Sequence, residues 1–142
     1  ILQSKEENRS KLVEFRRMIE VSGSLLAIDN ADEEDIRELE KIHERTKHDF
    51  SRGKATVEND MEFHRQIYMS THNPFVVSIG SMIMELFQPS LVISNRDYSR
   101  IVTDNHDKIL NALKQRDKKA MEEAIVISLE KWKELSLDDF WS

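Results

Sequence analysis

Apolar residues recur at intervals of three and four along most of the chain, a spacing that places them on one face of an α-helix. The residues between these segments support the same boundaries. Asp32 and Asp117 are typical of the position before a first helical turn, and Pro74 suits the first turn itself. The expected helices cover about residues 5–28, 32–52, 56–72, 74–87, 103–114 and 117–135.

Three local features complete this pattern. Asp32 with Asp35 predicts a capping box, and Thr56 predicts a cap for the third helix. Residues 75–87 are apolar almost all round, which indicates either a central buried helix or a helix at an interface. Residues 94–100 are polar and are expected to form a loop.

The composition favours the same fold class. The chain has 142 residues with only 3 glycines and 2 prolines, too few for the many tight turns of a β-sandwich. We therefore expect a single domain over residues 1–142, folded as an all-α antiparallel bundle of six or seven helices.

Charge and cysteine content exclude several classes of function. The formal net charge is -6 and the basic residues do not cluster, so we expect no DNA binding by this chain alone. The absence of cysteine excludes disulfides and thiolate metal sites. The apolar runs are short, so we expect no transmembrane span, no signal peptide and a cytoplasmic location.

Polar side chains interrupt the apolar faces of four predicted helices. A buried polar group is costly unless something pairs with it, so several of them on inward faces indicate a shared polar pocket. The five residues concerned are Arg16, Asp60, His64, His106 and Ser128.

Three of these residues form a candidate metal site. Asp60 and His64 lie one helical turn apart on the same face, and His106 lies on the inward face of another helix. One carboxylate and two imidazoles suit a transition metal better than Ca²⁺. The alternative is that each histidine is a core residue with its hydrogen bonds satisfied, with His64 paired to Asp60.

The other two inward residues also have two interpretations. Arg16 either anchors an anion or covers the edge of the core with its stem. Ser128 either lines the pocket or bonds back to its own helix. The remaining histidines are predicted to be surface groups: His43, His48 and His72.

Three ordered stretches resemble a known family, the C-terminal ligand-sensing (FCD) domain of GntR-type, FadR-like bacterial transcription regulators. Residues 14–20 (EFRRMIE) match the opening helix of that domain. Residues 60–64 (DMEFH), followed by Asn73-Pro74, match its second signature. Residues 106–113 (HDKILNAL), followed by Asp117, match its third. The set spans nearly the whole chain.

The resemblance implies a homodimeric sensor, not an enzyme, that binds a small organic acid. By this likeness Asp60, His64 and His106 would hold a divalent metal, with Zn or Ni as the best candidates, and Arg16 and Ser128 would face the effector. In the family a winged helix-turn-helix domain precedes this one and supplies the DNA binding. Ser128 is a departure, because metal-binding members carry a further histidine at this place.

Three alternatives remain open from the sequence. The pocket would bind a metal-free effector such as an acyl-CoA, or the bundle would only dimerise. A metal-dependent hydrolase would need a general base beside a metal-bound water. Glu62 is the nearest candidate in the sequence, but it is expected to face away from Asp60 and His64.

Overall fold

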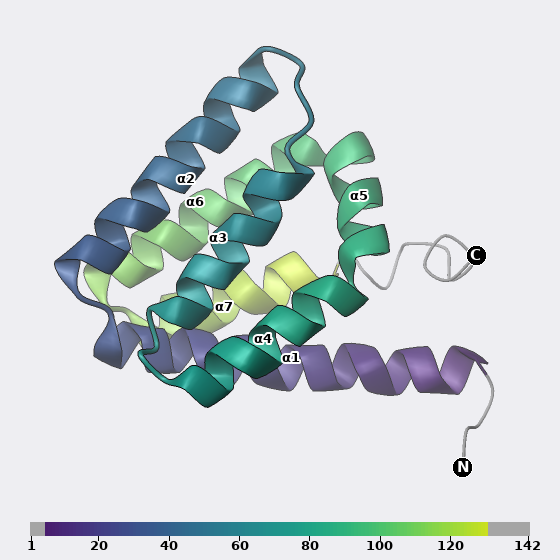
Figure 1. Ribbon diagram of the computed structural model, residues 1–142, viewed down its shortest axis with the longest axis horizontal. Coiled ribbons are helices and arrows are strands. Elements are labelled where there is room, and N and C mark those ends of the chain that lie inside the picture. Colours follow the sequence, from purple (N-terminus) through teal and green to yellow (C-terminus); the bar gives the residue numbers. More distant parts are fainter. Residues whose placement is uncertain (1–4, 131–142) are drawn as a thin grey trace.

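The computed structural model describes residues 5–130 and shows an all-α bundle over that range (Figure 1). The expected fold class is confirmed, at the upper end of the expected helix count. The helices are α1 (Lys5–Asn30), α2 (Glu33–Ser51), α3 (Val57–Met69), α4 (Pro74–Leu86), α5 (Gln88–Asp97), α6 (Ser99–Gln115) and α7 (Lys118–Glu130). Trp132 and Leu135, which the pattern assigned to the last helix, lie outside the described residues.

Helix α3 is central to the packing. It contacts α1, α2, α4 and α5, while α6 packs between α2 and α7, and α1 packs along α7 (Figure 1). The buried apolar side chains of α3, α6 and α7 meet in one core, whose members include Phe63, Ile67, Ile109, Leu113, Met121 and Ile125. The polar site described below lies on these same helices.

The predicted caps at Asp32 and Asp117 and the predicted start of a helix at Pro74 are confirmed. Asp32 and Asp35 form a reciprocal capping box, with N···O distances of 3.0 and 2.8 Å. The Asn73 side chain caps α4 before Pro74, and Asp117 accepts a hydrogen bond from the Ala120 N–H. Thr56 occupies the predicted N-cap position of α3, but its hydroxyl makes no capping bond.

The loop predicted for residues 94–100 is also wrong. This segment contains the end of α5 and the start of α6, separated only at Tyr98. The buried face of α5 is polar, so it gave no apolar periodicity: Ser90, Ser94 and Asn95 are buried beside Leu91. Ser90 and Asn95 hydrogen-bond to carbonyl groups one turn earlier, which satisfies these side chains inside the helix.

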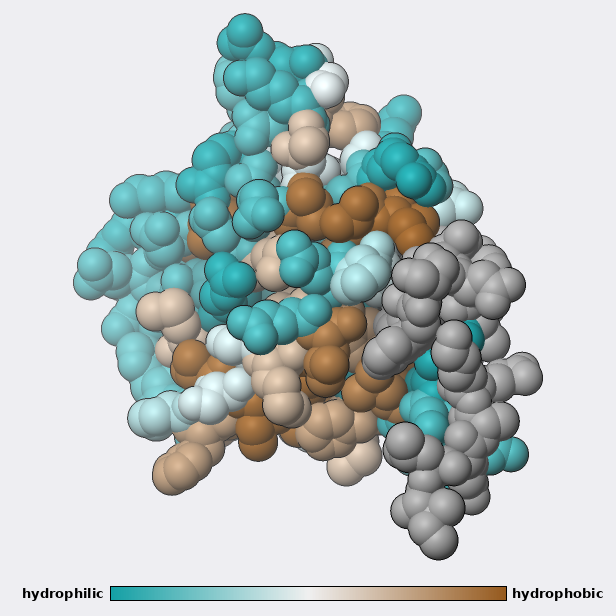
Figure 2. Space-filling view, turned by 45° about the vertical axis from the view of Figure 1, so that its right-hand side comes forward, coloured by the Kyte–Doolittle hydropathy of each residue, from teal (hydrophilic) through white to brown (hydrophobic). Residues whose placement is uncertain are grey.

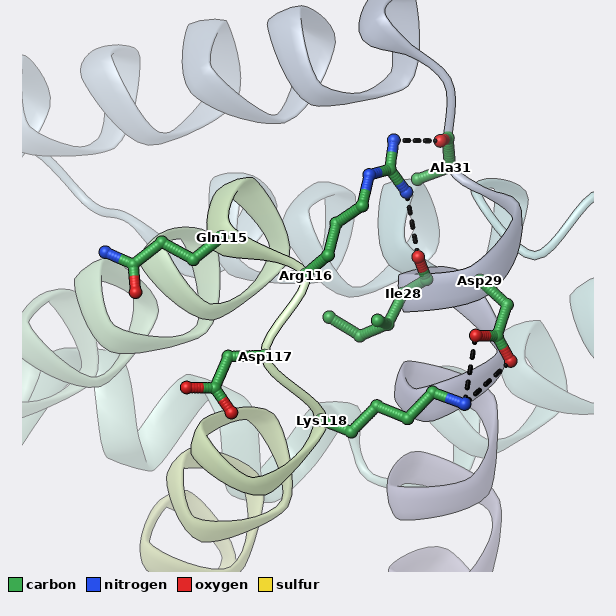
Figure 3. A pocket seen from close by; sticks show the side chains of 7 residues that line it. All are labelled: Ile28, Asp29, Ala31, Gln115, Arg116, Asp117 and Lys118. Carbon is green, nitrogen blue, oxygen red and sulfur yellow. Dashed lines mark hydrogen bonds and ion pairs between the residues drawn. The ribbon is translucent and has the colours of Figure 1, made fainter.

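Arg116 joins the C-terminal end of α1 to the turn between α6 and α7 (Figure 3). Its guanidinium donates to the carbonyl oxygens of Ile28 and Ala31 at 2.8 and 2.6 Å, and Lys118 pairs with Asp29 beside it. These groups line an open depression on the surface. Because Arg116 and Lys118 already bind groups at the end of α1 and just after it, we assign this depression a structural role and not a ligand-binding one.

The outer face of α4 is apolar and exposed. Phe75, Ile79, Met82 and Leu86 follow one stripe and are 81%, 39%, 46% and 40% exposed. Figure 2 shows apolar surface on the lower half of the molecule, at the height where α4 runs in Figure 1. Of the two predicted environments for this helix, the exposed stripe fits an interface.

Among residues 5–130, no single helix is long and apolar enough to cross a membrane. Helices α4 and α5 reach that length and composition only as a pair bent by 63°.

Candidate metal and anion site

Asp60, His64 and His106 converge in the interior of the bundle. Asp60 and His64 stand one turn apart on α3, and His106 reaches them from α6. Asp60 Oδ1 lies 3.2 Å from His64 Nε2 and 3.0 Å from His106 Nε2. All three side chains are buried, and each offers a ligand atom within 4.8 Å of the others.

The geometry of this cluster fits a bound ion better than a pair of hydrogen bonds. Asp60 Oδ1 has no hydrogen-bond partner among the described residues, so its two close nitrogens are not aligned for donation. Ligand atoms at 2.0–2.1 Å from a tetrahedral ion lie about 3.3 Å from one another, close to the observed separations. The donor set of one carboxylate and two imidazoles suits Zn²⁺ or Ni²⁺.

Contacts behind the cluster hold two of its members in place. Asn95 on α5 donates to Asp60 Oδ2 at 2.8 Å, and its own oxygen accepts from the Thr56 hydroxyl at 2.7 Å. The Phe63 ring stacks on His106 with centroids 4.0 Å apart and an interplanar angle of 2°. These contacts leave Oδ1 of Asp60 and Nε2 of His106 directed toward the shared centre.

Helix α1 closes the site with one cation and one anion. The inward face of α1 carries its charged residues, because Arg16 and Glu20 are each only 2% exposed whereas Phe15 and Ser22 are exposed. Arg16 Nη2 lies 3.5 Å from Glu20 Oε1, and its guanidinium carbon lies 4.5 Å from the centre of the Phe87 ring. Arg16 thus has its charged end inside the bundle, unlike an arginine that only covers the core edge.

A small cavity connects the cation of α1 with the two histidines. It offers about 20 Å³, which is room for one water molecule or one ion. Ser128 is half-buried and lines this cavity, while its hydroxyl donates to the Ile125 carbonyl at 2.7 Å, so both sequence interpretations of Ser128 describe part of its environment. The lining residues are Arg16, His64, Leu91, Ser94, Val102, Asn105, His106 and Ser128.

Burial and neighbouring charges shift the pKa values of these groups in opposite directions. Burial alone would lower the pKa of His64, but the carboxylates of Glu20 and Asp60 outweigh it and raise the pKa to about 9. Burial would raise the pKa of Glu20, yet Arg16 and His64 lower it to about 2. His106 and His64 hold the pKa of Asp60 well below its usual range against the same burial effect.

His106 behaves differently from His64. Burial lowers the pKa of His106, and the attraction of Asp60 does not reverse this effect. In the metal-free protein the proton of the cluster therefore sits on His64, between two carboxylates, while His106 stays neutral.

The three histidines predicted at the surface do not behave alike. His43 is only 1% exposed, and its Nε2 contacts Asp107 Oδ1 at 2.5 Å, so that prediction is wrong. Its position on α2 faces α6, and the charged neighbours in sequence concealed this. His48 and His72 are exposed as predicted. His72 lies near Asp32 and Asp35 in a second, exposed group of metal-ligand type.

Comparison with known protein families assigns the chain to one of them. A family model for the FCD domain matches residues 11–131. The chain belongs to the FCD domain family. This confirms the resemblance on which the three sequence signatures agreed.

A solved structure shares the fold of this FCD domain. E. coli McbR/YncC aligns with a TM-score of 0.77 and 19% sequence identity, over 88% of this chain and 62% of that one. The FCD domain described here thus spans about three-fifths of the length of that protein. Comparison with curated proteins gave no match.

Sequence reasoning missed several buried polar residues of this FCD domain, four of which lie in or beside the site. Glu20 was visible as a residue four positions after Arg16, within the matched 14–20 stretch, but no role was assigned to it. The sequence did not indicate that Asn95 or Asn105 is buried. Asn95 lies in the segment that was predicted to be a polar loop, and Asn105 is one of the polar residues that precede His106. The fourth residue is His43. Asn105 is buried, lines the cavity, and its Nδ2 has no hydrogen-bond partner within residues 5–130.

Proposed function

We propose that this FCD domain is the sensing and dimerising part of a cytoplasmic GntR-type transcription regulator and binds a small organic acid. Asp60, His64 and His106 hold a divalent metal, with Zn or Ni as the best candidates, and Arg16 and Ser128 face the effector. A winged helix-turn-helix domain preceding this one supplies the DNA contacts. The observation that carries the proposal is the convergence of three buried metal-ligand side chains, with Asp60 Oδ1 lacking a hydrogen-bond partner among the described residues, beside a buried arginine and a cavity.

The charges of the site favour an anionic ligand. When the histidines coordinate a divalent ion as neutral imidazoles, the carboxylates of Asp60 and Glu20 offset its two positive charges. Among residues 5–130, the guanidinium of Arg16 then adds one positive charge at the cavity, which favours a ligand with a carboxylate group. Asn105 adds a buried amide donor at the same cavity.

The size of the cavity supports a sensor. A space of about 20 Å³ admits an ion or a water molecule but not a complete carboxylic acid. A carboxylate ligand therefore has to separate the walls that α1, α5, α6 and α7 provide. Ligand binding then favours an opened arrangement of the helices over the closed one, which is the requirement for a switch between two states.

The exposed stripe of α4 supports dimerisation. A continuous row of large apolar side chains on one helix is typical of a protein interface. We assign this face to a second copy of the chain, in line with the dimer that the family resemblance implied.

A hydrolase is the less favoured interpretation. Glu62, the nearest candidate base in the sequence, is half-exposed and pairs with Arg45, as its expected outward orientation implied. It is therefore engaged away from the cluster and is not placed to activate a metal-bound water.

The metal content of the purified chain, prepared without a histidine tag, tests the proposal. We expect about one equivalent of Zn or Ni in the parent by mass spectrometry, and its loss in His64→Ala. His48→Ala is the matched control, because His48 is exposed and outside the cluster. Absence of metal in the parent, even after soaking, would refute the metal-based sensor and leave a metal-free effector pocket or a dimerising bundle.

A further inference from the structure

Glu20 is the buried group of the site whose role the proposed function leaves unexplained. One of its oxygens, Oε1, receives three contacts: His64 Nδ1 at 3.3 Å, the Tyr68 hydroxyl at 3.3 Å and Arg16 Nη2 at 3.5 Å. Glu20 is only 2% exposed, and burying its carboxylate costs free energy that these three contacts have to offset. The contacts reach both the metal cluster and the anion anchor.

We propose that Glu20 is a positioning residue that fixes the His64 ring for metal binding. His64 has two ring nitrogens, and the structure directs Nδ1 to Glu20 and Nε2 to the side of Asp60. A carboxylate oxygen 3.3 Å from Nδ1 attracts the ring proton to that nitrogen and so favours the tautomer whose Nε2 lone pair is free. Histidines that bind metals usually donate their second nitrogen in this way. The inference rests on the metal site of the proposed function.

His106 provides an internal comparison. Its Nε2 faces the same Asp60 oxygen, but its Nδ1 is buried with no hydrogen-bond partner among residues 5–130. The ring of His106 is held instead by stacking on Phe63. The two histidines thus use different supports, and loss of Glu20 should affect the orientation of His64 alone.

Zinc affinity and histidine tautomers, measured on the same variants, test this inference. We expect Glu20→Ala to weaken Zn²⁺ binding by about 10–100-fold in a competition titration with a chelator. Glu20→Gln retains an oxygen that accepts the Nδ1–H, so its affinity should fall between parent and alanine variant. Glu62→Gln also removes one carboxylate from the neighbourhood of α3, but an exposed one, and should leave the affinity unchanged.

Nitrogen NMR of the zinc-loaded protein separates positioning from a general effect on the fold. We expect a single tautomer for His64 in the parent, a mixture or a ring rotation in Glu20→Ala, and an unchanged His106 signal in every variant. Should Glu20→Ala fail to fold, Glu20→Asp replaces it, because its shorter side chain withdraws the oxygen from Nδ1 and keeps the charge.

The possible outcomes separate the positioning role from the metal site. Equal zinc affinity in the parent and a folded Glu20 variant would overturn the positioning role and leave the metal site intact. An equal fall in affinity in the Gln and Ala variants, without any change at His64, would overturn the positioning role as well. A parent that binds no zinc would overturn the metal site itself, and the positioning role of Glu20 with it.

Discussion

Two glycines face opposite edges of the same tyrosine ring, and alanine at each should have opposite effects on stability. Gly80 lies within α4 and Gly23 within α1, and both approach Tyr68, which is buried on α3. A Cβ atom added at Gly80 would stand 2.5 Å from two ring carbons of Tyr68. A Cβ atom added at Gly23 would stand 3.4 Å from the ring, an ordinary contact.

The magnitudes follow from two opposing effects. Alanine replaces glycine in a helix interior with a gain of about 1 kcal/mol at either position. At Gly80 the ring has to move by roughly 1 Å to restore a normal carbon–carbon distance. Such overpacking in a dense core costs about 1–3 kcal/mol, and the movement also strains the bond from the Tyr68 hydroxyl to Glu20.

We therefore expect Gly80→Ala to be destabilised by up to about 2 kcal/mol, and Gly23→Ala to be stabilised by about 0.5–1 kcal/mol. Urea unfolding followed by circular dichroism at 222 nm measures both values with the parent as reference. A Gly80→Ala variant as stable as Gly23→Ala would refute the close approach of α4 to the Tyr68 ring.

Four further predictions concern the site, the surface and the α6–α7 turn. In the metal-free protein, folding raises the pKa of His64 to about 9. The contribution of His64 to the free energy of unfolding is therefore complete below pH 6.5 and is lost as the pH rises through about 9. The free energy of unfolding should fall by up to about 3 kcal/mol over this window in the parent, but not in His64→Gln. Ser128→His should strengthen zinc binding by at least about tenfold in a chelator competition, since it adds a nitrogen ligand at the cavity wall. Ile79→Glu should convert a dimer to a monomer, measured by light scattering, because it places a charge on the apolar stripe of α4. An unchanged molecular mass would exclude this face as the dimer interface. Arg116→Ala should lower the free energy of unfolding by about 1–2 kcal/mol, because the carbonyl oxygens of Ile28 and Ala31 lose their donor while the left-handed backbone (φ 52°) remains.

The fold was predictable because α1, α2, α3, α6 and α7 have apolar faces with helical periodicity. Helix α5 was not, since its buried face carries Ser90, Ser94 and Asn95, whose side chains find partners only after the helix has formed and packed. Periodicity detects hydrophobic burial and does not detect polar burial, so such a helix reads as a loop.

The candidate site shows the same division. Asp60, His64 and His106 were found from the sequence because they interrupt otherwise apolar faces, and the structure brings them together. Glu20 was missed because the inward face of α1 differs from the one its apolar residues suggest. The face of α1 that lies toward the site carries Arg16 and Glu20. The pairing of these two charges offsets part of the cost of burying them.

The pairing of α1 with α7 has a consequence for the order of assembly during synthesis. The bonds that Arg116 makes to the end of α1 join residues 88 and 85 positions apart, and α7 lies still later in the chain. Of the described helices, α1 is synthesised first, but α7, with which it makes its most extensive contact, is synthesised last. Glu20 can meet His64 and Tyr68 once α3 has been synthesised, whereas the cavity beside Arg16 lacks one wall until α7 brings Ser128. Among residues 5–130, the wall of the cavity that Ser128 provides is therefore the part that is completed last.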